Sequence, residues 1–343
     1  HMRSTLCGTA ARALARAPLA RASAASTHRQ QIIPVTMGGL NIGSRGRLPA
    51  AAATARQMSA KAQFDGEIAQ IYGDFFSQLT PSWEAMLVAV DRVNAGGFGR
   101  PKSKKVDKHL QRVLDVASGP GQPAMLIAQK YRSAVVESTD VAPDMVSQAA
   151  VSVAAAGLGD RVTCSVLDMN DMSRIEPSSV DLVTVSFGLM FTDDLPLALS
   201  QIHRVLKPNG VLAATVWLEM PLMGATMQTM TAVLGQAPPS PAINPMELAD
   251  RSKLDGPLKE SGFVLLDDTT GTIDFDMGPQ ETAWRMGTLT VNAKLKELDA
   301  AGTHGDVWAR VKAAYGDATK NWIVDGRVKA PPSAYRLIVA KRR

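Results

Sequence analysis

A short apolar run, Val113 to Val116, contains an acid and opens at once into a glycine turn, and this feature constrains the fold more than any other in the chain. Gly119 and Gly121 lack a Cβ atom, so the backbone can take left-handed dihedrals there and come close to a ligand. A glycine turn at the carboxyl end of a buried strand is typical of the nucleotide pocket of a doubly wound α/β domain. The sequence therefore predicts a parallel sheet with a pocket at this strand end.

Acids also stand at the ends of the next two predicted strands. The run 134–140 ends in Asp140, and the run 161–168 ends in Asp168. Asp140 lies about 20 residues beyond the glycine turn, a spacing at which an acid commonly meets a ribose hydroxyl. Because parallel strands share one carboxyl edge, we expect these acids to line the same edge of the sheet.

This ordered set resembles the class I S-adenosylmethionine-dependent methyltransferases. Residues 115–121 are similar to that family's first motif, Asp140 to its ribose-binding acid, and Asp168 with Met169 to its adenine contact. Residues 202–210 are similar to its late helix, turn and strand signature. The similarity covers most of the chain after the first sixty residues and is densest between the glycine turn and Trp217.

The resemblance implies an α/β fold: a doubly wound, seven-stranded, Rossmann-like sheet with an N-terminal helical cover and a helical insertion before the last strand. It implies S-adenosyl-L-methionine as the cofactor. The cofactor-binding residues that it implies are Tyr72, Asp115, Ala117, Gly119, Gly121, Asp140, Met145, Asp168, Met169 and Ser186. Tyr72 is also the candidate catalytic residue, because small-molecule members place a tyrosine near the methionine part of the cofactor. The alternative role for Tyr72 is to anchor a helix in the core.

Two positions depart from the family pattern. Ala117 stands where the family usually has its first glycine, and Asn209 stands where it usually has a glycine in the late turn. Alanine is small enough to let the first turn close, and asparagine is the non-glycine residue best suited to a left-handed turn position.

A nicotinamide or flavin dinucleotide is the alternative cofactor. Its third glycine would fall at Ala124, and alanine is an allowed variant there, so the spacing alone does not exclude it. The acid at Asp168 and the block from Arg204 to Gly210 argue against a dinucleotide, because pyrophosphate binding requires neither.

The first part of the chain has the composition of an organellar transit peptide. Residues 1–64 hold no Asp or Glu and nine Arg or Lys, which leaves 28 basic against 32 acidic residues in the remainder. We expect a transit peptide over 1–60, directed to the mitochondrion or alternatively the plastid. A disordered basic tail is the other interpretation. An N-terminal cover and basic loop over 61–105 and a methyltransferase domain over 106–343 follow.

Composition argues against several classes of partner. The basic excess lies in the leader, so the mature chain lacks the basic stripe that nucleic acid requires. No apolar run approaches the ~20 residues that a membrane span needs, and the five His residues show no metal-ligand spacing. Cys164, the only thiol beyond the leader, is expected to pack as a small apolar side chain.

The segment before the last predicted strand is far longer than a hairpin needs. Helical spacing over 281–298 and 307–315 predicts a helical substrate lid at about 275–328, which favours a small-molecule substrate. The alternatives are a structural cap or the surface of a homodimer. Met220, Met223, Met227 and Met230 form a further cluster, which is interpreted either as pocket lining or as ordinary packing.

Methyl transfer to a small organic acceptor in an organelle is the favoured function. The acceptor is either a quinone ring carbon, as in ubiquinone/menaquinone-type relatives, or the sulfur or an oxygen of a small acid, such as a methylthio-hydroxy acid on a route to sulfonium osmolytes. A non-catalytic assembly factor that binds the cofactor is the alternative of another class. A base is needed only for a hydroxyl or ring-carbon acceptor; the candidates considered are His203, His304, Asp193 and Asp194, and His203 is expected to be structural.

Overall fold

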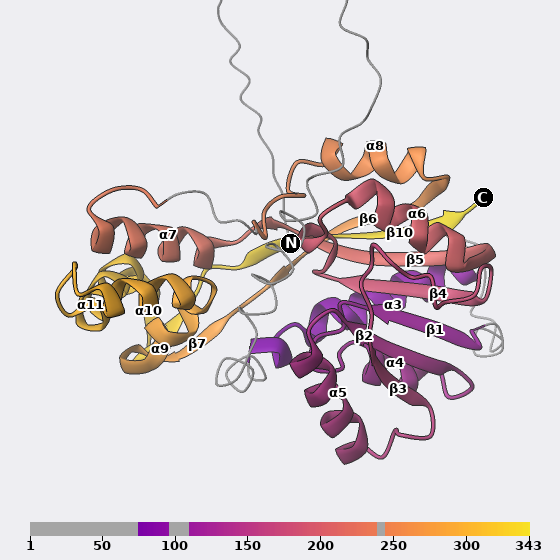
Figure 1. Ribbon diagram of the computed structural model, residues 1–343, viewed down its shortest axis with the longest axis horizontal. Helices are drawn as coiled ribbons and strands as arrows, with labels where there is room; N and C mark the ends of the chain where they lie inside the picture. The colour runs from indigo at the N-terminus through magenta and orange to yellow at the C-terminus, as the bar shows by residue number, and fades with distance from the viewer. Residues whose placement is uncertain (1–74, 96–109, 239–243) are drawn as a thin grey trace, which may run out of the picture. The chain divides into compact units, whose positions relative to one another are not determined.

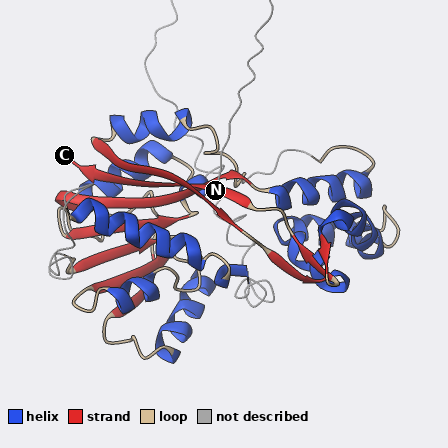
Figure 2. Cartoon of the chain, turned by 180° about the vertical axis from the view of Figure 1, so that it is seen from behind, coloured by secondary structure: helices blue, strands red, loops and turns tan. Residues whose placement is uncertain are grey.

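The computed structural model describes residues 75–95, 110–238 and 244–343 (Figure 1). The expected transit peptide, Tyr72, the loop 96–105 and most of the expected N-terminal cover lie outside the described residues. The described part of the chain forms an α/β fold with one large sheet, one small sheet and flanking helices (Figure 2).

The large sheet has seven strands in the order β3-β2-β1-β4-β5-β10-β6. The strands are β1 (Arg112–Val116), β2 (Val135–Asp140), β3 (Val162–Val166), β4 (Val180–Ser186), β5 (Leu206–Glu219), β6 (Phe263–Ile273) and β10 (Ser333–Arg342). The neighbours from β3 to β5 pair in parallel, whereas β10 is antiparallel to both β5 and β6. The fold class predicted from the sequence is confirmed. Because β1 pairs with both β2 and β4, the strand order reverses at β1, and a crevice is expected outside its carboxyl end.

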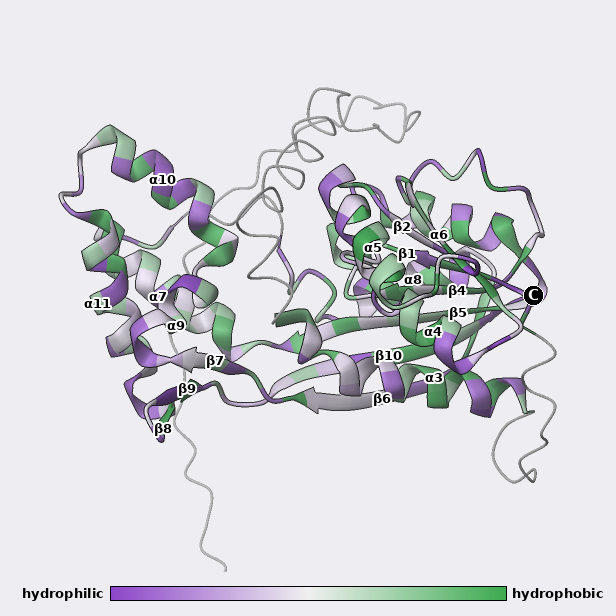
Figure 3. Ribbon diagram, turned by 90° about the horizontal axis from the view of Figure 1, so that it is seen from below, coloured by the Kyte–Doolittle hydropathy of each residue, from purple (hydrophilic) through white to green (hydrophobic). Residues whose placement is uncertain are grey.

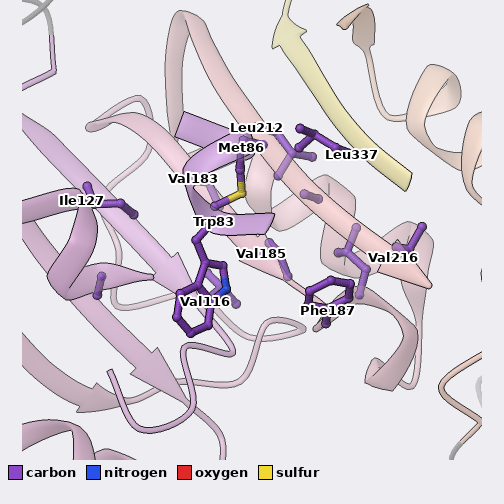
Figure 4. Packing of buried hydrophobic residues seen from close by; sticks show 14 of the residues in the cluster. Trp83, Met86, Val116, Ile127, Val183, Val185, Phe187, Leu212, Val216 and Leu337 are labelled. Carbon is purple, nitrogen blue, oxygen red and sulfur yellow. The ribbon is translucent and has the colours of Figure 1, made fainter. Parts of the chain in front are cut away.

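Helices cover the sheet and bury its apolar strands. They are α3 (Thr80–Asn94), α4 (Ala124–Lys130), α5 (Pro143–Ala155), α6 (Leu195–Val205) and α8 (Ser252–Glu260). The helix α3 begins at Thr80 with Pro81 in its first turn. The backbone N–H groups of a first turn have no partner within the helix, so a proline costs no hydrogen bond there. Its residues Trp83 and Met86 are buried and pack with Val183 and Leu212 of the sheet (Figure 4). Strands covered on both faces read as largely apolar runs, and the buried central strands β1 and β4 follow this pattern.

A second group of helices stands between β6 and β10 in the chain and after β5. We call it the cap: α7 (Pro221–Leu234) together with residues 276–329. The latter range holds β7 (Asp276–Pro279), α9 (Gln280–Gly287), α10 (Asn292–Ala301), α11 (Val307–Thr319), β8 (Ile323–Val324) and β9 (Arg327–Lys329), with short 3-10 turns at 289–291 and 320–322. The helix α7 lies beside α9 and α11 (Figures 1 and 3).

The cap has an apolar core of its own. Its members come from three helices: Met230, Val233, Leu295, Leu298, Val307 and Val311. The cap also contains the small sheet, whose strands lie in the order β7-β9-β8. The sequence placed a helical insertion before the last strand, and the structure has it; α7 joins it because its buried residues face α10 and α11.

Candidate functional site

A cavity opens at the carboxyl ends of β1, β2 and β4, where the strand order reverses. Seven of the ten cofactor-binding residues expected from the sequence line it: Ala117, Gly119, Asp140, Met145, Asp168, Met169 and Ser186. Tyr72 lies outside the described residues. The parallel sheet brings these side chains together because six of them stand at or just beyond strand ends and Met145 stands in the first turn of α5, which follows β2.

The loop after β1 takes a conformation that glycine favours. Gly119 and Gly121 have φ of +55° and +101°, and Ala117 has φ of +55°. A Cβ atom at Gly119 would lie 3.3 Å from Cζ of Phe76, which leaves little room for a side chain. Asn209 adopts the expected left-handed conformation, with φ of +67°, and Ala117 is left-handed as well. The two departures from the family pattern therefore keep the backbone geometry.

Asp140 connects the end of β2 to this loop. Its Oδ2 accepts a hydrogen bond of 2.9 Å from the backbone N–H of Gly119, and its Oδ1 accepts one of 3.0 Å from the N–H of Ala142. Burial raises the pKa of the Asp140 carboxyl, and the backbone donors oppose this rise. The residue is nevertheless partly exposed at the cavity, so its oxygens keep lone pairs that a ligand hydroxyl can reach.

The third strand end supplies a second acid. Asp168 is partly exposed, and its Oδ1 accepts a hydrogen bond of 2.8 Å from the N–H of Asn170. The amide oxygen of Asn170 in turn accepts a bond of 2.6 Å from Oγ1 of Thr192. This contact ties the end of β3 to the segment after β4. Met145 and Met169 are buried beside the acids and give this part of the cavity an apolar wall.

Asp115 and Gly121 stand behind the loop and not on the cavity wall. The Asp115 carboxylate is fully buried and accepts bonds from Oγ1 of Thr184 (2.5 Å) and the N–H of Ala124 (3.0 Å). Burial is the main cause that raises its pKa to about 7. A Cβ atom at Gly121 would lie 3.3 Å from Cα of Ala149, so this glycine lets the loop approach α5. Both residues support the loop's shape in the structure.

Aromatic side chains that the sequence did not single out as cofactor contacts form the other walls. Phe187 stacks on Trp217 with ring centroids 3.9 Å apart, and both line the cavity with Phe75 and Phe76. Phe187 has φ of +51°, and its N–H donates to both the carbonyl and the hydroxyl oxygen of Thr215. The available signals were the Phe-Phe pair ahead of Pro81 and the position of Phe187 directly after a predicted strand.

The methionine cluster divides between two roles. Met220 and Met223 line the cavity, whereas Met230 belongs to the apolar core of the cap. Pro245 and Thr290 also reach the cavity. The cavity is therefore bounded by the sheet on one side and by the cap on another.

The four candidate bases lie in different places. Asp193 lines the cavity. Asp194 caps α6, where its carboxylate accepts from the N–H of Leu197. His203 packs edge-on against Phe263, and burial lowers its pKa, while the His304 ring contacts Thr303 at 2.7 Å and is not among the cavity residues.

Other features of the described residues bear on partners. Within the described ranges, no cluster of three or more His, Cys, Asp or Glu side chains is arranged to hold a metal ion. None of the helices in the part of the chain that the structure covers is long and apolar enough to cross a membrane. Cys164 is a half-buried free thiol on β3, and burial raises its pKa.

Comparison with known proteins agrees with this geometry. Residues 113–210 match the family model described as methyltransferase domain. The demethylmenaquinone methyltransferase of Bacteroides fragilis is 26% identical over 153 residues, which cover 43% of this chain and 60% of that protein. The enzyme of the same name from Thermus thermophilus is 33% identical over 152 residues, with coverages of 43% and 64%. The malonyl-[acyl-carrier protein] O-methyltransferase of Halorhodospira halophila is 28% identical over 237 residues, with coverages of 67% and 73%.

The chain thus spans about 60% of the length of the first of these relatives. The matched segment runs from β1 into β5 and contains the glycine loop, Asp140 and Asp168. The strand order of the large sheet, the glycine loop after β1 and the match to the family model together define the class of protein. The chain belongs to the class I S-adenosylmethionine-dependent methyltransferases, and the family implies S-adenosylmethionine as the cofactor.

Proposed function

We propose that this protein transfers the methyl group of S-adenosylmethionine to a small organic acceptor. One observation carries the proposal: a single cavity joins the acidic strand ends to an aromatic and methionine-lined region that the sheet and the cap share. The acids suit a nucleoside, and the apolar region suits an organic group held beside it.

The residues at the strand ends fit the cofactor. Asp140 would accept from the ribose hydroxyls, and Asp168 with Met169 would hold the adenine. A side chain on Gly119 would crowd Phe76, so glycine lets this ring pack against the loop that lines the cavity. S-adenosylmethionine, when bound, supplies a methyl group on a positively charged sulfur.

The protein's own contribution is orientation and exclusion of water. Phe187, Trp217, Met220 and Met223 would hold the acceptor, and the cap would act as the substrate lid. Asp193 is the candidate base that lines the cavity, and it would take a proton if the acceptor is a hydroxyl or an activated ring carbon. A thioether acceptor would need no base.

A quinone-type ring carbon is the favoured acceptor. The stacked rings of Phe187 and Trp217 offer a flat apolar wall, and two of the relatives described above are named demethylmenaquinone methyltransferases. The sulfur of a methylthio-hydroxy acid is the competing acceptor. A homodimer with the cap at its interface is a further arrangement to test by solution scattering.

We also propose that the protein works in an organelle. The support is the absence of Asp and Glu from residues 1–64 beside nine basic residues. Residues 1–60 fused to a fluorescent protein should direct it to mitochondria or to plastids; diffuse fluorescence would contradict the proposal.

The test of the activity begins with calorimetric titration of the protein with S-adenosylmethionine and S-adenosylhomocysteine. Methyl transfer is then measured with a demethylated quinone and a methylthio-hydroxy acid, with Asp140→Asn as the control for site-specific turnover. Turnover identifies the acceptor class. Binding without turnover on a broad acceptor panel would favour a non-catalytic assembly factor, and no binding would exclude the proposed function.

A further inference from the structure

Gln78 joins the segment before α3 to the first strand of the cap. Its side-chain Oε1 accepts a hydrogen bond of 2.7 Å from the backbone N–H of Asp276, and its Nε2 donates one of 3.3 Å to the backbone carbonyl of the same residue. The amide group thus pairs with both backbone groups of Asp276, although 198 positions separate the two residues in the sequence.

Asp276 is in turn an anchor of the small sheet. Its carboxylate accepts two bonds, of 2.8 and 3.1 Å, from Nε of Arg327 on β9. Its Oδ1 also accepts from the N–H of Gly278 at 2.9 Å, and its backbone pairs with Lys329. A displacement of Asp276 would therefore disturb the contacts of both β7 and β9.

The other end of this connection faces the cofactor loop. Phe75 stacks in parallel on Phe275, with ring centroids 4.6 Å apart, next to the Gln78 contact. Phe76 lies over Gly119, because a Cβ atom there would be 3.3 Å from its Cζ. Phe75 and Phe76 both line the cavity. Residues 75–79 therefore form one wall that touches the cofactor loop on one side and the cap on the other.

We infer that Gln78 is a positioning residue that couples cofactor binding to the order of the cap. A ligand that occupies the space beside Gly119 contacts the wall that holds Phe76, and this wall has a hydrogen-bonded connection to β7. Ordering of one end then favours ordering of the other, because two sites joined by directional contacts share a coupling free energy. The inference rests on the proposed function, since it takes the ligand to be S-adenosylmethionine or its product.

The test measures hydrogen exchange of the full-length protein with and without S-adenosylhomocysteine. In the wild type, the ligand should slow exchange in residues 276–279 and 327–329 as well as in the loop 117–121. Gln78→Met keeps the length of the side chain and removes both hydrogen bonds. It should keep the slowing in 117–121, lose it in β7 and β9, and raise the Kd of the ligand about two- to tenfold.

Two further variants separate coupling from general loss of structure. Thr80→Ala removes a hydrogen bond to Ser77 in the same turn but leaves Gln78 in place, so it should behave as the wild type. Gln78→Glu keeps an acceptor for the N–H of Asp276 and loses the donor, so it should give an intermediate Kd and partial slowing in β7. The melting temperature of each variant, taken with ligand absent, checks that it is folded.

The outcomes are distinct. Equal slowing of β7 and β9 by the ligand in wild type and Gln78→Met would overturn the inference while leaving the proposed function intact, as would a wild type whose cap does not respond to the ligand. Failure of the wild type to bind the ligand would overturn both. Loss of the cap response in Gln78→Met alone, with the loop response kept, is the result that supports the coupling.

Discussion

The backbone N–H of Gly119 donates a hydrogen bond of 2.9 Å to the carboxylate of Asp140, across the ends of two neighbouring strands. The acid that is expected to bind the ribose therefore also holds the glycine loop in shape. Because Asp140 also accepts from Ala142, its carboxylate is oriented before any ligand arrives. Such preorganisation lowers the cost of ordering the site on binding.

Replacement of Asp140 by alanine should weaken cofactor binding by roughly 1.5–3 kcal/mol, because charge-assisted hydrogen bonds to the ligand are lost. The variant should also melt at a lower temperature, since Gly119 and Ala142 lose their acceptor. Calorimetric titration with S-adenosylmethionine measures the first effect, and thermal unfolding without ligand measures the second. An unchanged Kd would remove Asp140 from the cofactor site.

Cofactor affinity should depend on pH through the same group. Burial raises the pKa of Asp140, and the ionised form is the better acceptor. Binding should therefore weaken on acidification at a higher pH than an exposed Asp would produce. Asp140→Asn does not titrate, so its weaker binding should lack this step; the same step in the variant would assign it to another group.

Asp115 should make the stability of the fold depend on pH in the opposite sense to a salt-bridged acid. Its pKa is about 7 in the fold, against 3.8 for an unperturbed Asp, so the native state holds a proton that the unfolded chain has lost between these values. Its contribution to stability is therefore fully present below the unfolded pKa and is lost as pH rises through about 7.

Asp115→Asn resembles the protonated acid, because its amide can donate to Thr184 and accept from Ala124. The free energy of unfolding of this variant, measured with urea from pH 4.5 to 8.5, should decline less with rising pH than that of the wild type. Parallel curves for the two proteins would show that Asp115 does not titrate in this range.

The sequence predicted the parts of the fold whose local pattern agrees with their tertiary setting. The central strands β1 and β4 are largely buried apolar runs, and the covering of both their faces keeps this pattern visible in the sequence. The late turn was also predictable, since asparagine at position 209 tolerates the left-handed φ of +67° found there.

Other elements could not be predicted, because ion pairs between distant parts of the chain override the local sequence pattern. The strand β6 begins in the apolar run 263–266 and continues to Ile273, beyond two acids that normally argue against a strand. Asp267 pairs with Arg92 of α3 at 2.7 Å, and Asp268 pairs with the fully buried Arg336 of β10 at 2.9 Å. The partners of these acids are distant in the sequence, so no local signal shows that they are neutralised.

The sequence predicted the acids of the candidate site better than it predicted the aromatic side chains that form the cavity walls. Asp140 is found by its spacing from the glycine turn and Asp168 by its place at a predicted strand end. The wall formed by Phe75 and Phe76 instead depends on the docking of a segment that precedes the sheet. Asp115 follows the family motif and nevertheless stands behind the loop, because its strand position points it at Thr184.

The effects of substitutions at Gly188 and Ala117 on the free energy of unfolding should depend strongly on each other. A Cβ atom at Gly188 would lie 2.7 Å from Cβ of Ala117 and 2.9 Å from Cγ1 of Val185, so Gly188→Ala should destabilise the fold by about 1–3 kcal/mol. Ala117→Gly removes the closer of these contacts. It also removes the strain of an alanine in the left-handed conformation, and this strain costs roughly 1–2 kcal/mol. The larger backbone entropy of glycine offsets part of that gain.

A double-mutant cycle in urea measures the dependence. Gly188→Ala should cost less in the Ala117→Gly background than in the wild type. Equal costs in the two backgrounds would mean that Val185 alone limits the space at Gly188.

The role of the cap as a lid can be tested at Gly287 without touching the cavity. A Cβ atom at Gly287 would lie 2.2 Å from the buried ring of Tyr315, so Gly287→Ala should force α9 and α11 apart at a cost of about 1–3 kcal/mol. Gly316→Ala on α11 is the matched control: a Cβ atom there meets nothing within 4 Å, and alanine in a helix should stabilise by about 0.5–1 kcal/mol.

If the cap closes over the acceptor, Gly287→Ala should raise the KM for the acceptor and lower kcat. The Kd of S-adenosylhomocysteine should change far less, because the strand ends that are expected to hold the adenine and ribose are not part of the cap. Gly316→Ala should keep all three constants near their wild-type values. Wild-type KM and kcat in Gly287→Ala, with its thermal stability lowered, would mean that the cap supports the fold without shaping the acceptor site.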